Sequence, residues 1–472
     1  ALAGLAALLA GGIAPPSAAR AQPAPAAPPR RLRLRAMPAE GRLGGPDAEP
    51  SPLLRLAPLD EAGAVIGDGG FPVLRVRLGE EVTLAVENGL GQPTGFHIRG
   101  LRGPNAADPV TDLAGAPLAP GAGAEIAFRA RQSGTFLIQP VLAPHVAEQN
   151  ARGLGAALIV EESPAPAFDH DLVLAVSDWR LDEKGRLAGD FNDRRDAARI
   201  GRLGNRLVAN GAPAPSALAV RPGARLRVRM INTANARVIP LRVSGFPAQV
   251  YAIDSTPCQP FDPLKRTVTL SPGTRIELVI DAPRSAGQSG AIEARLGEGL
   301  PILRLTTEGA PLPPPATLAP LPDPGLPPAI RLQDAMRAEC VIAGGAPREP
   351  AEAEPAALAA RFPDPARIFT INGAPGGFSG RPLLSARRGA VIVLALVNRT
   401  FWPQVIAVHG HAFRLLHPFD DGWEPYFLDT LYLAPGTTAR IAFIADNPGR
   451  WAIRSTIAEH FAAGVASWIE VR

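Results

Sequence analysis

The sequence predicts an all-β protein built from three Greek-key β-sandwich domains. Apolar and polar residues alternate over many short segments, which is the pattern of half-buried strands. The 472 residues include 48 Gly and 53 Pro, so turns are frequent and long helices are disfavoured. The strand-rich segments also fall into three blocks, each about the size of one sandwich. We place the domains at 31–165, 166–310 and 367–472.

The first segment, 1–30, is predicted to be an export signal followed by a linker. Ala1–Ile13 is short, apolar and rich in Ala and Gly, and positions 19–21 read Ala-Arg-Ala, an A-x-A-like cleavage site. Its weak hydrophobicity favours the twin-arginine route, and the alternative is a disordered tail. We therefore expect a periplasmic or otherwise exported protein, with no membrane span after signal removal, because no apolar run reaches the ~20 residues that a span needs.

The three blocks contain segments with clear strand patterns. Val73–Leu90 alternates on both sides of Gly79 and predicts a hairpin, and Gly153–Glu162 closes the first block. Asp171–Asp182 opens the second block with a further alternating segment. Between the second and third blocks, 311–366 is rich in Pro, Ala and Glu, which predicts a long connection with at most one short helix, near Ile330–Ile342.

Charge and cysteine content narrow the possible functions. The net charge is only +4 and the arginines are spread along the chain, so we expect no nucleic-acid partner. The two cysteines, Cys258 and Cys340, either form one disulfide or remain two buried thiols, because their separation along the sequence does not fix their distance. The sequence contains no Gly-x-Ser-x-Gly motif and no phosphate-binding loop.

Several separated motifs carry a resemblance to a known family. In the second block these are Asn210-Gly211, the run 229–232 (Arg-Met-Ile-Asn), the run 252–254 (Ala-Ile-Asp) and the run 272–275 (Pro-Gly-Thr-Arg). Their order resembles the second domain of three-domain multicopper oxidases. The last segment, 449–472, resembles the C-terminal copper motif of the same superfamily. The resemblance implies three cupredoxin-like domains, with the first and third packed against each other.

The resemblance also implies where copper would bind, and most of those positions hold other residue types. A blue copper site requires a cysteine thiolate, and Ser455 stands where that cysteine is expected. Histidine remains at three ligand positions, which are His97, His409 and His460. The replaced positions are Arg99, Gln139, Val141, Gln404, Ala407, Arg454, Ser455 and Thr456. We therefore expect no metal site, no catalytic or cofactor-binding residue and no copper cofactor, with retained copper as the alternative.

Three functions are compatible with this pattern. The resemblance to the copper-depleted, periplasmic cell-division proteins of the superfamily implies a non-enzymatic binding or scaffold protein, with a protein partner in the periplasm such as the division machinery. The alternative is a laccase-like, copper-dependent oxidoreductase. The third possibility is a mononuclear metal protein that uses His97, His409 and His411.

The two arginines at former ligand positions lead to a structural hypothesis. If the chain keeps the arrangement of strands that the resembled family has around its copper ions, Arg99 and Arg454 enter one shared cavity between the first and third domains. Glu459 is then a candidate partner. A guanidinium is planar, always charged and rich in donors, so the pair would act as an inter-domain clamp. The alternative is that both side chains point outward into solvent.

Overall fold

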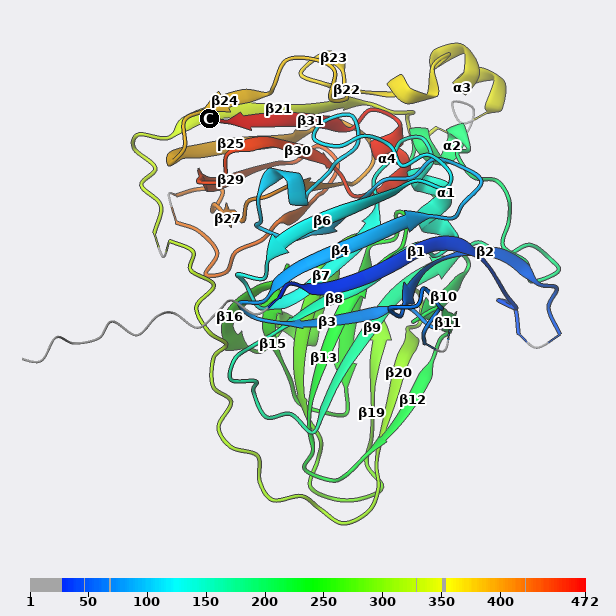
Figure 1. The fold of residues 1–472 in the computed structure, drawn as a ribbon, viewed down its shortest axis with the longest axis vertical. Helices are drawn as coiled ribbons and strands as arrows, with labels where there is room; N and C mark the ends of the chain where they lie inside the picture. Colours follow the sequence, from blue (N-terminus) through cyan, green and yellow to red (C-terminus); the bar gives the residue numbers. More distant parts are fainter. Residues whose placement is uncertain (1–27, 46, 68, 328, 350–353, 421) are drawn as a thin grey trace, which may run out of the picture.

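The computed structural model describes residues 28–45, 47–67, 69–327, 329–349, 354–420 and 422–472. Six sheets form three sandwiches, so the predicted all-β class is confirmed (Figure 1). The first domain lies between the other two in Figure 1, and the segment after the second domain runs along one side of the molecule to the third. The predicted export signal lies outside the described residues, as does the predicted linker apart from its last three positions.

The first domain packs two four-stranded sheets around a core that includes Leu34, Leu56 and Phe136. One sheet has the order β2-β1-β4-β6, and the other has the order β3-β8-β7-β5. The elements are β1 (Arg30–Gly41), β2 (Ser51–Leu59), β3 (Val73–Arg77), β4 (Glu81–Asn88), β5 (Phe96–Arg99), η1 (Asn105–Ala107), β6 (Gly123–Arg129), β7 (Gly134–Pro140), α1 (Val146–Ala151) and β8 (Ala156–Glu161).

The hairpin predicted for Val73–Leu90 is wrong, although both of its strands are present. β3 pairs with β8, whereas β4 pairs with β1 and β6 in the opposite sheet. Gly79 has a φ of 91° and its N–H donates to the carbonyl of Ala130, so the turn carries the chain from one sheet to the other. Alternation along the sequence predicts strands, but it does not say which neighbours they pair with.

The second domain has a seven-stranded sheet, β11-β10-β9-β13-β18-β15-β16, packed on a five-stranded sheet, β12-β20-β19-β14-β17. Its core includes Leu226, Met230 and Leu278. The elements are β9 (His170–Trp179), α2 (Arg194–Ala198), β10 (Arg206–Ala209), β11 (Ala212–Pro213), β12 (Ser216–Val220), β13 (Arg225–Asn232), β14 (Ile239–Ser244), β15 (Ala248–Ile253), β16 (Thr256–Phe261), η2 (Leu264–Arg266), β17 (Thr267–Leu270), β18 (Arg275–Asp281), β19 (Ser289–Ala294) and β20 (Leu300–Thr307).

The third domain packs a six-stranded sheet, β23-β22-β21-β25-β29-β27, on a five-stranded sheet, β24-β31-β30-β26-β28. The elements are β21 (Met336–Gly344), α3 (Pro355–Arg361), η4 (Pro365–Arg367), β22 (Phe369–Ile371), β23 (Ala374–Pro375), β24 (Leu384–Ala386), β25 (Ala390–Asn398), β26 (Gln404–Val408), β27 (Arg414–Leu415), β28 (Thr430–Leu433), β29 (Thr438–Ala445), β30 (Gly449–Ser455), α4 (Ala458–Ala462) and β31 (Ala466–Val471).

The short helix allowed near Ile330–Ile342 is not there, because most of that segment is strand β21; the helix of this connection is α3. This strand pairs in parallel with β25 and buries Cys340 and Ile342 in the core of the third domain. The segment 311–366 is therefore only in part a connection. Both cysteines are free thiols, and burial raises the pKa of Cys258 and of Cys340 to about 12. No helix among the described residues is long and apolar enough to cross a membrane.

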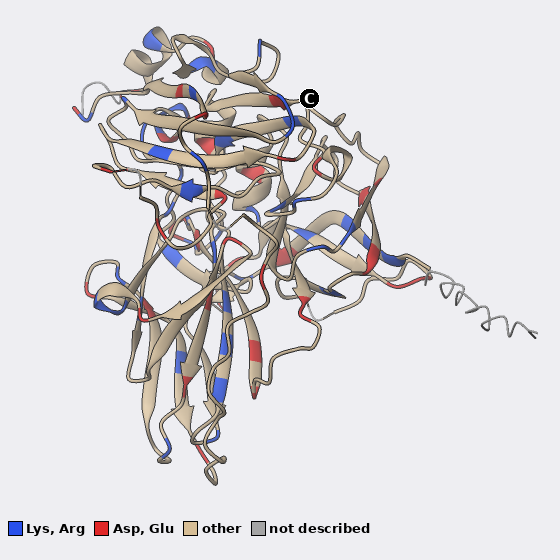
Figure 2. Cartoon of the chain, turned by 90° about the vertical axis from the view of Figure 1, so that its left-hand side faces the viewer, with Lys and Arg blue, Asp and Glu red and all other residues tan. Residues whose placement is uncertain are grey.

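Two apolar clusters join the third domain to its neighbours. Val141, Val146 and Phe461 belong to a buried cluster between the first and third domains. Ala236, Val405 and Ile457 belong to a second cluster, between the second and third domains. Figure 2 shows Lys and Arg interspersed with Asp and Glu across all three domains. Some of these charged groups are buried where the domains meet.

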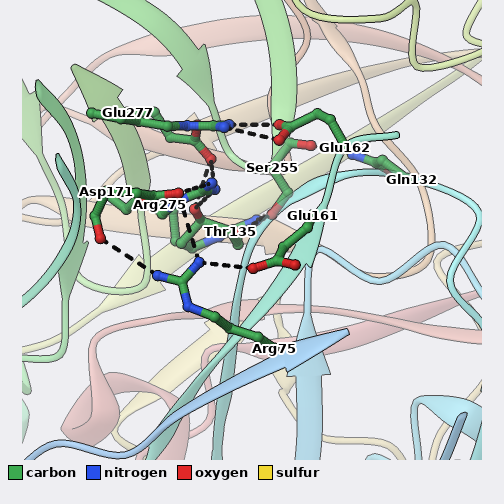
Figure 3. A network of polar contacts seen from close by, with 11 residues as sticks. Arg75, Gln132, Thr135, Glu161, Glu162, Asp171, Ser255, Arg275 and Glu277 are labelled. Carbon is green, nitrogen blue, oxygen red and sulfur yellow. Dashed lines mark hydrogen bonds and ion pairs between the residues drawn. The ribbon is translucent and has the colours of Figure 1, made fainter. Parts of the chain in front are cut away.

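A buried ionic network joins the first domain to the second (Figure 3). Arg227 donates to Glu162 at 2.7 Å and to Glu277 at 2.8 Å, and Arg229 donates to Glu277 at 3.0 Å. Thr135 of β7 also donates to Glu277, at 2.7 Å. Burial opposes the ionisation of Glu277, but Arg227 and Arg229 lower its pKa to about 2. This carboxylate therefore stays charged and holds strands of two domains together.

A second buried ion group joins all three domains at Arg275. Its guanidinium donates twice to Asp429 of the third domain, with Nη1 at 2.9 Å from Oδ1. It also donates to Ser255 Oγ at 2.9 Å and contacts the carbonyl of Thr135 in the first domain. Asp254 accepts from the backbone N–H groups of Asp429 and Thr430, at 3.1 and 2.9 Å. Arg275 and its partners thus fix the orientation of the domains around the site described next.

Candidate functional site at the junction of the first and third domains

Two imidazoles meet face to face between the first and third domains. His97 lies on β5, and His409 follows the last residue of β26. Their ring centroids are 4.6 Å apart and their planes differ by 9°, so the rings stack. Both side chains are buried, with 1% and 5% of their surface exposed. The two histidines that the mononuclear-metal alternative grouped together do meet in the structure.

A buried carboxylate, Asp108, holds both rings. Its two oxygens lie 3.1 Å from His97 Nδ1 and 2.9 Å from His409 Nδ1. Burial lowers the pKa of both imidazoles and opposes the ionisation of Asp108. The hydrogen bonds from His409 and His97 lower the pKa of Asp108 below its usual range. The consistent state is a carboxylate that accepts from two neutral Nδ1–H groups. Each Nε2 then carries a lone pair.

The two arginines at former ligand positions enter this junction. Arg99 is 3% exposed and Arg454 is 1% exposed, so the alternative in which both point into solvent is wrong. Arg454 Nη2 donates to His97 Nε2 at 2.9 Å, and its Nη1 donates to the carbonyl of Ser455 at 2.9 Å. With its amide oxygen turned toward the donors, Gln139 accepts from Arg454 Nη2 at 2.9 Å and from Arg99 Nη2 at 2.8 Å. Gln139 thus bridges the two guanidinium groups.

Strand pairing explains why these side chains meet. β5 pairs with β7, and His97 lies opposite Gln139 in the register. β26 pairs with β30, and Ala407 lies opposite Arg454. Because Ala407 is small, it leaves room on the neighbouring strand for the long arginine side chain. The first domain therefore supplies the histidine and the bridging amide, and the third domain supplies the guanidinium.

Replacing Arg454 with alanine is expected to lower the free energy of unfolding by roughly 1–3 kcal/mol, because the substitution leaves buried polar groups of two domains without a partner. Relief of the repulsion between Arg454 and Arg99 limits the loss. Urea denaturation measures the change, and Arg450→Ala on the same strand is the matched control, because Arg450 is exposed. Equal, small effects of both substitutions would contradict the clamp.

A second group of predicted positions lies around His460 on α4. Its Nε2–H donates to the carbonyl of Arg199 at 2.8 Å, and its Nδ1 lies 3.0 Å from the side-chain oxygen of Gln404. Burial lowers the pKa of His460 to about 4, so the ring is neutral at pH 7. Ser455 Oγ accepts from the backbone N–H of Ile457 at 3.1 Å. The Nε2–H of His460 and the serine oxygen are therefore used in hydrogen bonds within the protein.

The other predicted positions are part of the packing. Val141 belongs to the apolar cluster with Phe461, and Ala407 is 1% exposed. The Thr456 hydroxyl donates to the carbonyl of Val405 at 3.4 Å. Among the described residues, Glu459 is not a partner of either arginine: its Oε1 accepts from Asn235, and its buried Oε2 has no hydrogen-bond partner. Val141 and Ala407 thus fill two of the former ligand positions with apolar side chains, and Thr456 fills a third with a polar side chain.

Sequence reasoning missed Asp108 and misjudged His411. Asp108 lies in an irregular segment after η1, so no strand or motif pattern points to it. His411 Nδ1 bonds the carbonyl of His409 at 3.1 Å, and its ring packs edge-on against Trp451. Among the described residues, the group able to hold a metal consists of His97, Asp108 and His409, whose ligand atoms all lie within 4.8 Å of one another. Asp108, rather than His411, therefore stands beside the two histidines.

Comparison with known proteins places each domain in the same family. Three family models described as multicopper oxidase match residues 60–165, 170–296 and 349–472. Together they span most of each of the three sandwiches. The last match ends on the segment that contains Arg454, Ser455 and His460.

Relatives and solved structures give the same assignment. Multicopper oxidase MmcO of Mycobacterium tuberculosis is 25% identical over 84% of this chain and 81% of its own length. Cell division protein FtsP of Sodalis glossinidius is 31% identical, but over only 49% of each chain. The crystal structure of a multi-copper oxidase from Pseudomonas thermotolerans superimposes with a TM-score of 0.79 and 27% identity, over 95% of this chain and 100% of the other. With its three cupredoxin-like domains, the chain belongs to the multicopper oxidase superfamily.

Proposed function

We propose that this chain is a copper-free member of the superfamily that acts by binding a protein partner rather than by oxidising a substrate. The observation that carries the proposal is the hydrogen bond from Arg454 Nη2 to His97 Nε2, at 2.9 Å. In this arrangement a guanidinium takes up the lone pair that an imidazole would offer to a copper ion. The nitrogen is buried, so a metal can reach it only if Arg454 moves.

The donor set around His97 and His409 fits a copper cluster poorly. Two imidazoles and one carboxylate are available, and Asp108 already binds both rings through Nδ1. The guanidinium groups of Arg454 and Arg99 place fixed positive charge beside the same atoms, and that charge repels a cation. Copper is what the family normally binds, but this site is arranged to hold arginine.

The donor set around His460 does not fit a blue copper ion. Such a site requires a thiolate, and Ser455 offers a hydroxyl oxygen that already accepts a backbone hydrogen bond. Neither cysteine stands at this position, because Cys258 lies on β16 of the second domain and Cys340 lies on β21. The Nε2–H of His460 is also committed, because it donates to the carbonyl of Arg199.

The proposed role is that of an exported scaffold protein of the cell-division type. Support comes from the partial match to cell division protein FtsP and from the export signal inferred from the sequence. The proposal places the protein in the periplasm, with a protein partner that belongs to the division machinery, and includes no nucleic-acid partner. In this proposal, the protein has no membrane span once its signal is removed.

A copper-dependent, laccase-like oxidoreductase is the second candidate. The relatives that match most of this chain carry oxidase names, whereas the match to the cell-division protein covers about half of it. The observation in the structure that favours this candidate is the group of His97, Asp108 and His409, which could hold a single metal ion. Such an ion would have to displace Arg454 from His97.

Reconstitution with copper separates the two candidates. Protein incubated with excess Cu(II) and then dialysed against a chelator is expected to show no intense blue absorbance and no phenol-oxidase turnover, because Ser455 has no thiolate for charge transfer to copper. Metal analysis and absorbance spectra measure the outcome, and an active multicopper oxidase treated in parallel is the control. Stoichiometric copper with sustained turnover would overturn the copper-free proposal.

A further inference from the structure

An open cleft lies between the first and third domains, on the outside of the molecule. It encloses about 1900 Å³, including the part that is open to solvent. The start of β4 and the end of β6 border it on the first domain, and residues 446–448 border it on the third. Pro324, in the segment that runs along one side of the molecule, also borders it (Figure 1). Because most small-molecule pockets enclose roughly 300–1,000 Å³, this cleft has room for a stretch of polypeptide.

Hydrogen bonds between the two domains hold the sides of this cleft together. Asn447 Nδ2 donates to the carbonyl of Gly103 at 2.9 Å and to the carbonyl of Gly410 at 3.1 Å. Asn105 Nδ2 donates to the carbonyl of Arg450 at 2.7 Å. The two sides are therefore fixed relative to each other before any ligand binds, and such preorganisation reduces the entropy cost of binding.

Positive charge exceeds negative charge along the lining of this cleft. Its ionisable side chains are four arginines and two carboxylates, namely Arg102, Arg129, Arg131, Arg388, Glu81 and Asp446. Arg129 lies 3.7 Å from Glu81, but both side chains are more than half exposed, so this ion pair is weak. Among the described residues, the other three arginines have no carboxylate within ion-pair distance. The cleft therefore offers cations to a ligand.

Two of these arginines are held in place and still have unused N–H groups. Arg102 Nε donates to Gln132 Oε1 at 2.6 Å and its Nη2 donates to the carbonyl of Pro324 at 2.9 Å, which leaves Nη1 without a partner among the described residues. Arg388 Nε donates to the carbonyl of Asp446 at 3.1 Å, and its two terminal nitrogens remain for a ligand. Burial lowers the pKa of Arg102 while the charge of Asp446 opposes that shift, and a guanidinium keeps its proton at neutral pH.

The lining favours a peptide over a nucleic acid. Proteins that bind single-stranded nucleic acid stack its bases on aromatic side chains. Among the described residues that line the cleft, the one aromatic side chain is that of Phe128, which is 4% exposed. Glu81 and Asp446 would also repel a continuous row of phosphates. A peptide can place its carboxylates beside the arginines alone and can lay uncharged side chains beside the two acidic residues.

We propose that this cleft binds an acidic segment of a partner protein, whose carboxylates pair with Arg102, Arg131 and Arg388. Each carboxylate would accept from N–H groups that have no acceptor among the described residues, and a guanidinium can donate two parallel hydrogen bonds to a carboxylate. The inference rests on the binding function proposed above, for which it names the surface and the chemistry of the partner.

Fluorescence polarisation with a short labelled peptide that alternates glutamate with serine tests the proposal. The wild-type protein is expected to bind this peptide saturably, with an affinity that falls as salt screens the ion pairs, and to bind the glutamine-serine counterpart much more weakly. Arg131→Glu combined with Arg388→Glu should weaken binding by about tenfold or more. Arg242→Glu combined with Arg304→Glu is the matched control, because it changes net charge equally at two exposed arginines of the second domain, and it should leave the affinity within about twofold.

Cross-linking to the wild-type protein gives a second measurement that depends on no variant. The same peptide carrying a photoreactive group should attach to residues 101–105, 127–132 and 446–448, as located by mass spectrometry. Attachment spread over the whole surface, or equal losses in the two double variants, would overturn the cleft and leave the copper-free function standing. Succinate or an oligonucleotide that displaces the peptide at lower concentration would also overturn it, because the cleft would then suit another ligand class. Stoichiometric copper with oxidase turnover would overturn the proposed function, but not a peptide site that requires Arg131 and Arg388.

Discussion

Replacing Arg275 with methionine is expected to lower the free energy of unfolding by about 3–5 kcal/mol, because it removes the cation from a buried ion group. Arg275 has no exposed side-chain surface, and it binds Asp429 through two nitrogens. Methionine fills much of the space but leaves Asp254 and Asp429 without their nearest positive charge. Equilibrium denaturation in urea measures the loss.

The control for this substitution is Arg242→Ala, which removes an exposed arginine from β14 of the same domain. That change is expected to alter stability by no more than about 0.5 kcal/mol. Because Arg275 contacts all three domains, the variant should also show separate unfolding transitions, which differential scanning calorimetry would resolve. A variant as stable and as cooperative as the wild type would mean that the three domains are held together without this ion group.

Replacing Glu459 with glutamine is expected to change how stability depends on pH. Burial raises the pKa of Glu459 from 4.5 to about 7, with hydrogen bonds from Asn235 opposing the shift and the charge of Asp196 adding to it. The folded protein therefore keeps this proton at a pH where the unfolded chain has lost it. The stability that it contributes is fully present below pH 4.5 and is lost as pH rises to about 7.

The substitution removes this titration, so the stability of Glu459→Gln relative to the wild type should increase between pH 4.5 and 7.5. The expected increase is roughly 3 kcal/mol, from the free-energy equivalent of the pKa shift. Urea denaturation at several pH values measures it. Glu339→Gln in the same domain is the control, because Glu339 is exposed. A constant difference between Glu459→Gln and the wild type across this range would show that Glu459 ionises normally in the folded protein.

The sequence predicted the fold class and part of the site, because both follow from local patterns. The alternation of apolar and polar residues, together with the turn residues, located most strands. The resemblance to the copper motifs marked His97 and His409 as former ligands, and these two residues do lie together. Asp108 could not be found in this way, since it reaches the imidazoles from an irregular segment with no pattern of its own. The bridging of Arg99 and Arg454 by Gln139 also depends on two domains meeting, which no local pattern describes.

The errors have the same physical origin. Met336–Gly344 contains Ala, Arg and Glu, which favour a helix, but its parallel pairing with β25 overrides that preference. Val73–Leu90 alternates as a hairpin does, yet the core of a sandwich lies between its two strands. In both segments, partners distant in the sequence decided the structure.

The three-domain contact at Arg275 also constrains the order in which this chain can complete its structure during synthesis. Arg275 and Asp429 are separated by 154 positions, and the ribosome adds about 5–20 residues per second, so Asp429 emerges roughly 8–30 s after Arg275. During that interval the second domain carries a guanidinium whose principal carboxylate does not yet exist. The nascent second domain must therefore leave the surface around Arg275 exposed to water. That surface is buried only when the third domain has been synthesised and packs against it.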